Sequence, residues 1–183
     1  PAMPACLANS PGSFLGADFR FDLLRPGAAL YGVNPTPGRP NPMAQVVRLQ
    51  GRILQVRVID PPMSVGYGAA FRVSRRTRIA TVGLGYADGF LRSISGRARA
   101  WIAAGAAGRK EGTAVAVPLV GRVSMDLITL DVTDLAAPPA PGDLVDLLGP
   151  GQDVDALAEA GGTIGYEILT SLGRRYRRCY RDA

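Results

Sequence analysis

The amino-acid sequence predicts a mainly β chain with two short helices near its C-terminal end. Most apolar residues lie in short stretches rich in Val, Ile and Leu, which favours strands. The 23 glycines and 15 prolines are numerous for a helical protein and indicate many turns between those stretches. Hydrophobic residues make up 47% of the 183 residues, which is enough for a packed core.

Ahead of the first long strand, the sequence predicts a strand end, a turn and a linker. Residues 21–25 have the pattern of a strand end, and Gly27 that of a turn before a short helix beginning at Ala28. Residues 34–42 contain four prolines, which cannot sit inside a helix or a central strand. We therefore expect a linker over residues 34–42.

The strands expected after this linker are apolar stretches bounded by Gly, Pro or Asp. They cover residues 46–60, 78–84, 98–103, 115–120, 123–132 and 143–148. Ser124, Asp126 and Thr129 interrupt the fifth of these, so it is not a plain core strand. A final basic strand is expected over residues 175–181, where arginines alternate with Tyr and Cys.

Two short helices are expected between the last apolar strand and this basic one. The first covers residues 154–160, with Asp153 or Asp155 as its cap and a glycine pair as its end. The second lies between Thr163 and Gly173. Its apolar face consists of Ile164, Ile168 and Leu172.

Composition excludes several classes of function. The net charge of +6 comes almost wholly from arginine, since Lys110 is the only lysine, and we attribute this bias to a GC-rich genome rather than to nucleic-acid binding. The chain has no histidine, and Cys6 and Cys179 have no metal-binding spacing, so we expect no metal site. Without a long apolar run or a signal-peptide pattern, we expect no membrane contact and a cytoplasmic location.

Four clusters combine glycine with polar side chains, and three of them place a tyrosine beside the glycine. They are residues 66–71, 85–89, 121–126 and 163–167. Glycine lets the backbone approach a ligand closely, and tyrosine supplies a hydroxyl on a stiff arm. Any one cluster by itself is more readily explained as a tight turn with a packing tyrosine.

Taken together and in this order, the clusters resemble the alanine racemases, which are pyridoxal-phosphate enzymes of fold-type III. The motifs are Asn9-Ser10, Arg25-Pro26-Gly27-Ala28-Ala29-Leu30-Tyr31-Gly32, Gly66-Tyr67-Gly68-Ala69, Gly85-Tyr86-Ala87-Asp88-Gly89, Gly121-Arg122-Val123-Ser124-Met125-Asp126 and Thr163-Ile164-Gly165-Tyr166-Glu167. The resemblance runs from about residue 6 to the C-terminus, and six motifs in one order are far more specific than any single one.

This resemblance implies the last piece of a (β/α)8 TIM barrel over residues 1–42. It implies a β domain, barrel-like or of Greek-key type with two short helices, over residues 43–183. In the family the β domain of one subunit completes the active site of the other. We therefore expect a homodimer with shared active sites, pyridoxal 5'-phosphate as cofactor and alanine as substrate, so that the enzyme supplies D-alanine for peptidoglycan.

The cofactor residues are carried over from the resemblance. Ser10, Gly27 and Ala28 match positions that hold the cofactor phosphate by hydroxyl and backbone N–H groups, and Tyr166 matches a tyrosine that reaches the same phosphate. Arg25 matches an arginine that hydrogen-bonds the pyridine nitrogen. Because arginine stays charged, it favours an unprotonated ring nitrogen and a weaker electron sink.

The catalytic and substrate residues are carried over in the same way. Racemisation needs two acid–base groups on opposite faces of the cofactor, and Tyr67 matches the tyrosine of this pair; a lysine is the other. A phenol is a weak base at neutral pH, so this role requires nearby positive charge or donors. Tyr86, Met125 and Asp126 match the substrate pocket, with the Met125 N–H as the contact and Asp126 as an orienting group.

The sequence departs from the family in two places. Lys110 lies in a polar, glycine-flanked stretch that predicts a solvated hairpin loop, whereas the family keeps its Schiff-base lysine in the first strands of the barrel. We therefore expect this chain alone not to racemise alanine. Cys6 stands where the family usually has a histidine that supports the arginine matching Arg25. Since cysteine is a poorer partner, either another group orients Arg25 or the enzyme is tuned differently.

Two other functions are compatible with the sequence. One is a racemase of serine or of a broader set of amino acids on the same scaffold, which a substrate panel would distinguish. The other is a non-catalytic basic β module that binds a partner or a nucleic acid, suggested by the run Arg174-Arg175-Tyr176-Arg177-Arg178. Such runs are usually solvated surfaces, and salt-dependent binding to single strands would support this second function.

Overall fold

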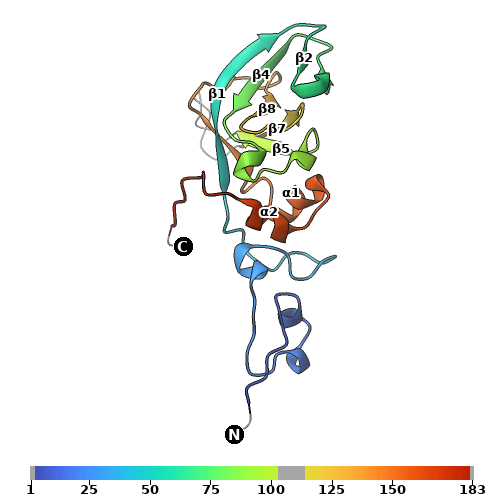
Figure 1. The fold of residues 1–183 in the computed structure, drawn as a ribbon, viewed down its shortest axis with the longest axis vertical. Helices are drawn as coiled ribbons and strands as arrows, with labels where there is room; N and C mark the ends of the chain where they lie inside the picture. Colours follow the sequence, from blue (N-terminus) through green and yellow to red (C-terminus); the bar gives the residue numbers. More distant parts are fainter. Residues whose placement is uncertain (1–2, 103–113, 182–183) are drawn as a thin grey trace.

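The fold is a closed β-barrel with helices at one end, which confirms the mainly β, barrel-like prediction (Figure 1). The structure, a computed structural model, describes residues 3–102 and 114–181. The barrel strands are β1 (Leu49–Ile59), β4 (Thr77–Val82), β8 (Ile128–Asp131), β7 (Val115–Val120), β5 (Arg99–Ile102) and β9 (Leu144–Leu148), in this order around the barrel.

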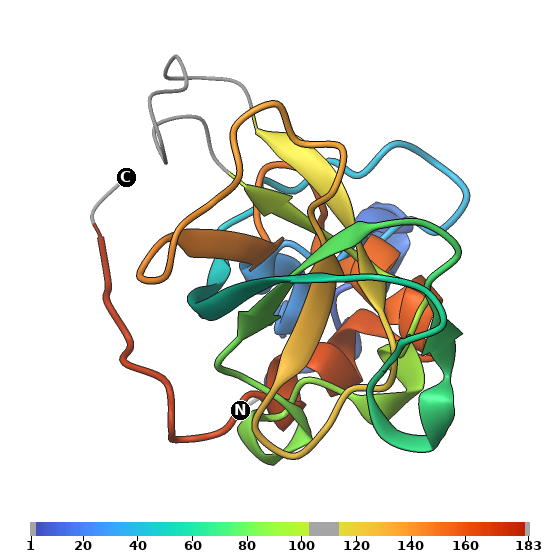
Figure 2. The same ribbon diagram turned by 90° about the horizontal axis from the view of Figure 1, so that it is seen from above.

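Closure of the barrel depends on β1, which pairs antiparallel with two strands. Its second half pairs with β4, from Ile53 opposite Val82 to Ile59 opposite Thr77. Its first half pairs with β9, and the register shifts within β1 in both pairings. Figure 2, which looks at the barrel from above, shows the strands surrounding a common interior. Every strand of the barrel therefore has two neighbours, and no backbone edge is left open.

The barrel interior and the helices share one apolar core. Fully buried side chains from five of the strands include Ile53, Val82, Ile102, Leu130 and Leu147. The helices α1 (Val154–Gly161) and α2 (Gly165–Ser171) pack on this core through Leu157 and Ile168. In Figure 1 both helices lie at the end of the barrel nearest the N-terminal residues.

The two helices begin and end close to where the sequence predicts. Asp153 caps α1 by accepting a hydrogen bond from the Ala156 N–H at 2.8 Å. Gly162 ends α1 in the left-handed conformation. Asp155, the other candidate cap, instead accepts a hydrogen bond from the Asn34 N–H at 2.7 Å. That bond ties the predicted linker to α1.

A smaller sheet lies beside the barrel. It consists of β2 (Ser64–Val65) and β3 (Phe71–Arg72), joined by the 3-10 turn η4 (Tyr67–Ala69). A second apolar cluster, which includes Val65, Val73 and Val120, packs this hairpin against the barrel wall. We call residues 64–72 the flap.

Two of the expected strands are corrected by the structure. The strand expected over residues 123–132 is present only as β8, because Ser124 folds back on Leu127 through its N–H and its hydroxyl, both donating to the Leu127 carbonyl. Residues 175–181 form no strand. The closed barrel offers no free edge to pair with them, and Arg175 and Arg178 instead make side-chain bonds to other parts of the chain.

The remaining strand predictions are confirmed, with bounds that differ by at most a few residues. β1, β5 and β9 lie within the predicted ranges 46–60, 98–103 and 143–148, β7 matches the range 115–120, and β4 begins one residue before the range 78–84. The predicted hairpin loop around Lys110 lies outside the described residues, as does the last residue of the predicted strand 98–103.

The N-terminal residues extend away from the barrel (Figure 1). They contain the 3-10 turns η1 (Gly12–Phe14), η2 (Ala17–Phe19) and η3 (Ala28–Tyr31) and a parallel bridge between Cys6 and Leu23. Several large apolar side chains are exposed here, among them Met3, Leu7, Leu15, Phe21 and Leu30. None of the described helices is long and apolar enough to cross a bilayer.

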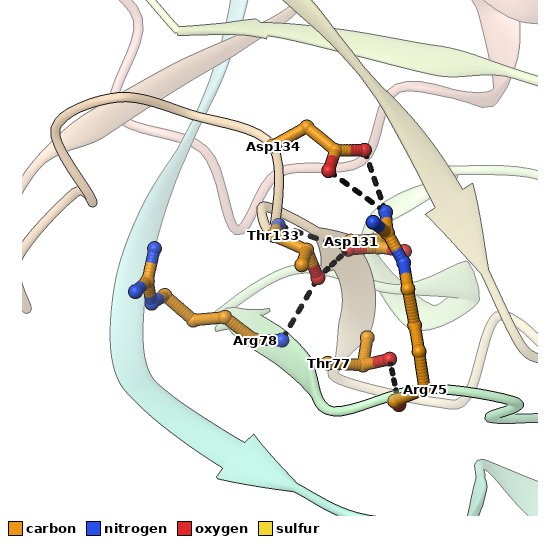
Figure 3. A network of polar contacts seen from close by, with 6 residues as sticks. All are labelled: Arg75, Thr77, Arg78, Asp131, Thr133 and Asp134. Carbon is orange, nitrogen blue, oxygen red and sulfur yellow. Dashed lines mark hydrogen bonds and ion pairs between the residues drawn. The ribbon is translucent and has the colours of Figure 1, made fainter.

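A polar network secures one end of β4 and β8 (Figure 3). The Asp131 carboxylate accepts from the N–H and the hydroxyl of Thr133, and the Thr133 hydroxyl accepts from the Arg78 N–H at 2.9 Å. Arg75 and Asp134 form an ion pair at 2.7 Å beside it, with both side chains exposed. The hydrogen bond to Asp134 raises the pKa of the Arg75 guanidinium.

A second polar group is buried where β9 meets β1. The Asp146 side chain is only 7% exposed, and it accepts two hydrogen bonds from Arg48, at 2.6 and 2.8 Å. Gln50 donates a third at 3.0 Å. The pKa of Arg48 is raised, chiefly by its hydrogen bond to this carboxylate.

Asp146→Ala should therefore lower the free energy of unfolding by about 2 kcal/mol, because charge-assisted bonds at a strand junction are lost. Asp134→Ala is the matched control, and it should leave stability unchanged, since that pair is exposed. Urea unfolding followed by circular dichroism measures both. Equal stability of the two variants would contradict the assigned role of Asp146.

Candidate functional site

The predicted site residues fall into three places in the structure. One group surrounds η3 and the start of α2, a second lies where the loop 121–127 meets the turn after β4, and Tyr67 is carried by the flap. The structure brings together the members of each of the first two groups.

The first group offers hydrogen-bond donors around the start of η3. Ser10 is buried, 3% exposed, and its Oγ accepts a hydrogen bond from the Ala29 N–H at 3.1 Å. Its own hydroxyl hydrogen is thus available to donate. The N–H groups of Gly27 and Ala28 have no acceptor among the described residues. No atom lies within 4 Å of the place where a Gly27 Cβ would be, so an anion can approach.

Arg25 is held by the segment around Cys6, which lies beside it. The Arg25 Nε donates to the Cys6 Sγ at 3.0 Å, and one terminal nitrogen donates to the Leu7 carbonyl at 3.3 Å. The Arg25 N–H also donates to the Ala8 carbonyl at 2.9 Å. Of the two alternatives left open by the sequence, these contacts bear on the first: besides the Cys6 sulfur, the Leu7 carbonyl orients the Arg25 side chain.

Tyr166 lies in the first turn of α2 and is 43% exposed. It borders a hollow of about 290 Å³ that is also lined by Val33, Asn34 and Asp155. A Cβ on Gly165 would lie 3.1 Å from a Val33 methyl, so α2 begins directly against the chain that follows η3. The fold therefore places the Tyr166 phenol on the same part of the molecule as the η3 donors.

The second group is built on a close backbone approach. The Tyr86 N–H donates to the Ser124 carbonyl at 3.0 Å, and the Ala87 N–H donates to the Met125 carbonyl at 2.9 Å. Both donors belong to the 3-10 turn η5 (Tyr86–Asp88). A Cβ on Gly85 would lie 2.2 Å from the Ser124 oxygen, so only glycine permits this contact.

These bonds fix the direction of the Met125 N–H. The Ser124 carbonyl and the Met125 N–H belong to one planar trans peptide, so they point in opposite directions. Since the carbonyl faces η5, the N–H faces away from it, and it has no acceptor among the described residues. The Met125 and Tyr86 side chains are 54% and 42% exposed. This N–H is therefore available to an external acceptor.

Asp126, beside Met125, is bound to a residue that the sequence did not single out. The Arg175 guanidinium donates to the Asp126 carboxylate at 2.7 Å and pairs with Asp88 at 3.2 Å. In the sequence, Arg175 is one of several neighbouring arginines, and they predicted a basic strand rather than a site. Asp88 belongs to the cluster 85–89, but the sequence of that cluster indicates no partner for its carboxylate.

Tyr67 is held by backbone contacts rather than by packing of its side chain, which is 72% exposed. Gly66 and Gly68 have φ values of +76° and +67°, which other residues rarely adopt. A Cβ on Gly66 would lie 3.1 Å from the backbone nitrogen of Arg122, and one on Gly68 would lie 3.4 Å from the Arg122 guanidinium. The flap thus rests on Arg122, a cation near Tyr67 that the sequence did not assign.

The structure does not join Tyr67 to the other two groups. A hollow of about 510 Å³ adjoins the flap and is lined by Phe71, Ser95, Arg122 and Asp131, but it contains none of the predicted site residues. No described residue forms a hydrogen bond with the Tyr67 hydroxyl. The phenol is presented outward from its own chain.

The family model for the alanine racemase C-terminal domain matches residues 46–180. The chain belongs to this family. An alanine racemase of Rhodospirillum rubrum is 56% identical over 181 residues, which cover 98% of this chain and 46% of that protein. The crystal structure of the Bartonella henselae alanine racemase, with covalently bound pyridoxal phosphate, has a TM-score of 0.87 and 43% identity, covering 99% of this chain and 48% of that one. The biosynthetic alanine racemase of Pseudomonas aeruginosa has a TM-score of 0.85 and 34% identity, covering 100% of this chain and 49% of that one.

The family resemblance drawn from six motifs is thus confirmed. The chain spans about half the length of the relatives that it matches, and it corresponds to their C-terminal part. The expected boundary between residues 42 and 43 stays a prediction, as do the roles of the individual site residues.

The donor groups present are compatible with the cofactor phosphate. Around η3 the Ser10 hydroxyl and the N–H groups of Gly27 and Ala28 form a set of donors, and the space beside Gly27 is open. Neutral hydroxyl and backbone donors at the start of a helical turn are suited to binding phosphate. The residues of this chain therefore fit the phosphate end of pyridoxal phosphate.

Gly85→Ala should displace the loop 121–127 from η5, because the added Cβ would overlap the Ser124 carbonyl. We expect a loss of about 2 kcal/mol in the free energy of unfolding. Gly149→Ala is the control, since its Cβ would meet its nearest neighbour at an ordinary 3.5 Å. Urea unfolding of both variants is the measurement, and an equally stable Gly85→Ala variant would contradict the close approach.

Proposed function

We propose that this chain forms the C-terminal half of a pyridoxal-phosphate-dependent alanine racemase. The observation that carries the proposal is the outward presentation of the Tyr67 phenol on a glycine-framed turn, in a chain of the racemase family. The alanine specificity, the cytoplasmic location and the supply of D-alanine to peptidoglycan belong to this proposal.

The residues around η3 would hold the cofactor. The Ser10 hydroxyl, the N–H groups of Gly27 and Ala28 and the Tyr166 phenol donate to its phosphate, and Arg25 donates to its ring nitrogen. When bound, pyridoxal phosphate withdraws electrons from the substrate α-carbon and so makes its proton removable. Cys6 and the Leu7 carbonyl keep the Arg25 side chain directed for its contact.

Tyr67 acts as one of two acid–base groups. Its phenolic oxygen takes up or returns the α-proton on one face of the substrate, while a lysine of the N-terminal half serves the other face. Arg122, packed beneath Gly68, supplies positive charge close to this turn. The Met125 N–H, free and facing away from η5, binds the substrate carboxylate.

The active site is shared between two copies of the chain. In the described residues Tyr67 meets neither the η3 donors nor Tyr166, and its side chain is open to solvent. A second copy that brings its cofactor site to this phenol accounts for an exposed catalytic group. The working unit that we propose is therefore a homodimer, in which the flap and the loop 121–127 of one copy complete the site of the other.

The arginine run near the C-terminus gives little support to a nucleic-acid-binding function. Arg175 is occupied by Asp126 and Asp88, and Arg178 donates to the carbonyls of Leu172 and Gly173. Both guanidinium groups stabilise the chain's own fold, and the carboxylate partners of Arg175 reduce the positive charge available to phosphates.

A chimera tests the proposed function. Residues 1–183 replace the matching C-terminal part of the Rhodospirillum rubrum alanine racemase, which is 56% identical. We expect this chimera to form a dimer and to interconvert L- and D-alanine, and the 183-residue chain alone to show no turnover. A dimeric, cofactor-loaded chimera without racemase activity would contradict the proposal.

In this chimera Tyr67→Phe should lower kcat about a thousandfold, because the acid–base group of one face is lost. Tyr180→Phe is the matched control, since Tyr180 is 90% exposed and lies outside the proposed site. Polarimetry in both directions, with cofactor content checked by absorbance, gives the comparison. A Tyr67→Phe enzyme as fast as Tyr180→Phe would exclude the proposed role.

A further inference from the structure

Three segments distant in sequence meet beside the Met125 peptide. They are η5, which carries Tyr86, the loop 121–127, and the segment that follows α2. Backbone bonds join the first two, and the Gly173 N–H donates to the Asp88 carbonyl at 3.0 Å, which joins the third. One side chain, Arg175, has polar contacts with both of the other segments.

Arg175 bridges two carboxylates. Its Nη1 donates to the Asp126 Oδ1 at 2.7 Å, and its Nε lies 3.2 Å from the Asp88 Oδ1. The planar guanidinium can contact both at once, because its donors point in several fixed directions. Asp126 immediately follows Met125, and Asp88 lies in the same turn as Tyr86. The bridge thus connects the two elements of the substrate-side group.

The Asp88 end of this bridge is rigidly held. The Asp88 side chain is only 9% exposed, and its other oxygen accepts the Gly85 N–H at 2.8 Å. Asp126, by contrast, is about half exposed, and Arg175 is its only polar side-chain partner among the described residues. The position of the Asp126 carboxylate therefore depends on Arg175.

The backbone near Arg175 is anchored as well. Tyr176 packs against the main core, and Arg178 donates to the Leu172 and Gly173 carbonyls at 3.2 and 3.3 Å. Burial raises the pKa of the Tyr176 phenol, so this neighbour stays neutral. The hydrogen bond to Asp126 and the charge of Asp88 raise the pKa of Arg175. Without Arg175, two carboxylates would face each other with no cation between them.

We propose that Arg175 is a positioning residue that fixes the Met125 peptide so that its N–H meets the substrate carboxylate. This inference rests on the proposed function, since it concerns the substrate contact of the same site. Arg175 touches neither substrate nor cofactor in this role. It acts by holding Asp126, and with it the end of the loop 121–127, against η5.

The test uses Arg175→Gln in the Rhodospirillum chimera. We expect the KM for alanine to rise about tenfold with kcat changed less than about twofold, because the lost interaction orients a binding contact. Arg177→Gln is the matched control: it removes the same charge two residues away, from an exposed side chain with no partner among the described residues. Asp126→Asn and the double variant should raise KM no further than Arg175→Gln alone.

A second measurement does not depend on turnover. Hydrogen exchange of the Tyr86 and Ala87 amides, which donate to the loop, should be about tenfold faster in Arg175→Gln than in Arg177→Gln. Arg175→Lys keeps the charge but cannot span both carboxylates, so its amide exchange rates and its KM should lie between those of Arg175→Gln and those of the parent chimera. If Arg175→Gln does not fold, the same two measurements are made on Arg175→Lys.

The outcomes separate the two proposals. Unchanged KM and unchanged amide exchange in Arg175→Gln would overturn the positioning role. A drop in thermal stability with KM unaltered would make Arg175 a merely structural residue and overturn it too. An inactive parent chimera would contradict the proposed function instead, and the exchange rates of the two amides would still decide whether Arg175 fixes the loop.

Discussion

The closure of the barrel through β1 is the constraint on which the rest of this structure depends. One eleven-residue strand pairs with β9 along its first part and with β4 along its second, and this double pairing makes a ring of six strands. A ring has no free edge, so the polar segments between strands must turn outward at its ends. The flap, η5 and the loop 121–127 are such segments, and they carry four of the residues assigned to chemistry.

Backbone contacts, more than side-chain packing, give these segments their shape. The Gly85 backbone accommodates the Ser124 carbonyl, and Gly66 and Gly68 allow the flap to rest on Arg122. At Gly85 and Gly66 the missing side chain lets two main chains approach closely, and at Gly68 it leaves room for the Arg122 guanidinium. The result is a set of exposed side chains on well-defined backbones, which suits residues that must meet a ligand or a second chain rather than their own core.

The charged side chains near these segments are paired in ways that hold them in place. Asp88, almost buried, accepts a backbone bond and faces Arg175, which reaches on to Asp126. The cations with most bearing on the candidate site, Arg25, Arg122 and Arg175, come from three separate parts of the sequence. The same fold therefore explains why an arginine-rich composition here need not indicate a nucleic-acid-binding surface.

The sequence by itself determined the fold class, five of the barrel strands, both helices and the family. Periodic apolar stretches and glycine–tyrosine motifs are local signals, because each depends only on residues that are close in the sequence. Tertiary structure decided the rest. Residues 123–127 leave the strand pattern because η5 binds their carbonyls, and residues 175–181 are not a strand because a closed barrel has no edge for them. Arg175, Asp88 and Arg122 were not assigned for the same reason: their significance comes from contacts with residues 49 to 87 positions away, and no spacing along the chain records such contacts.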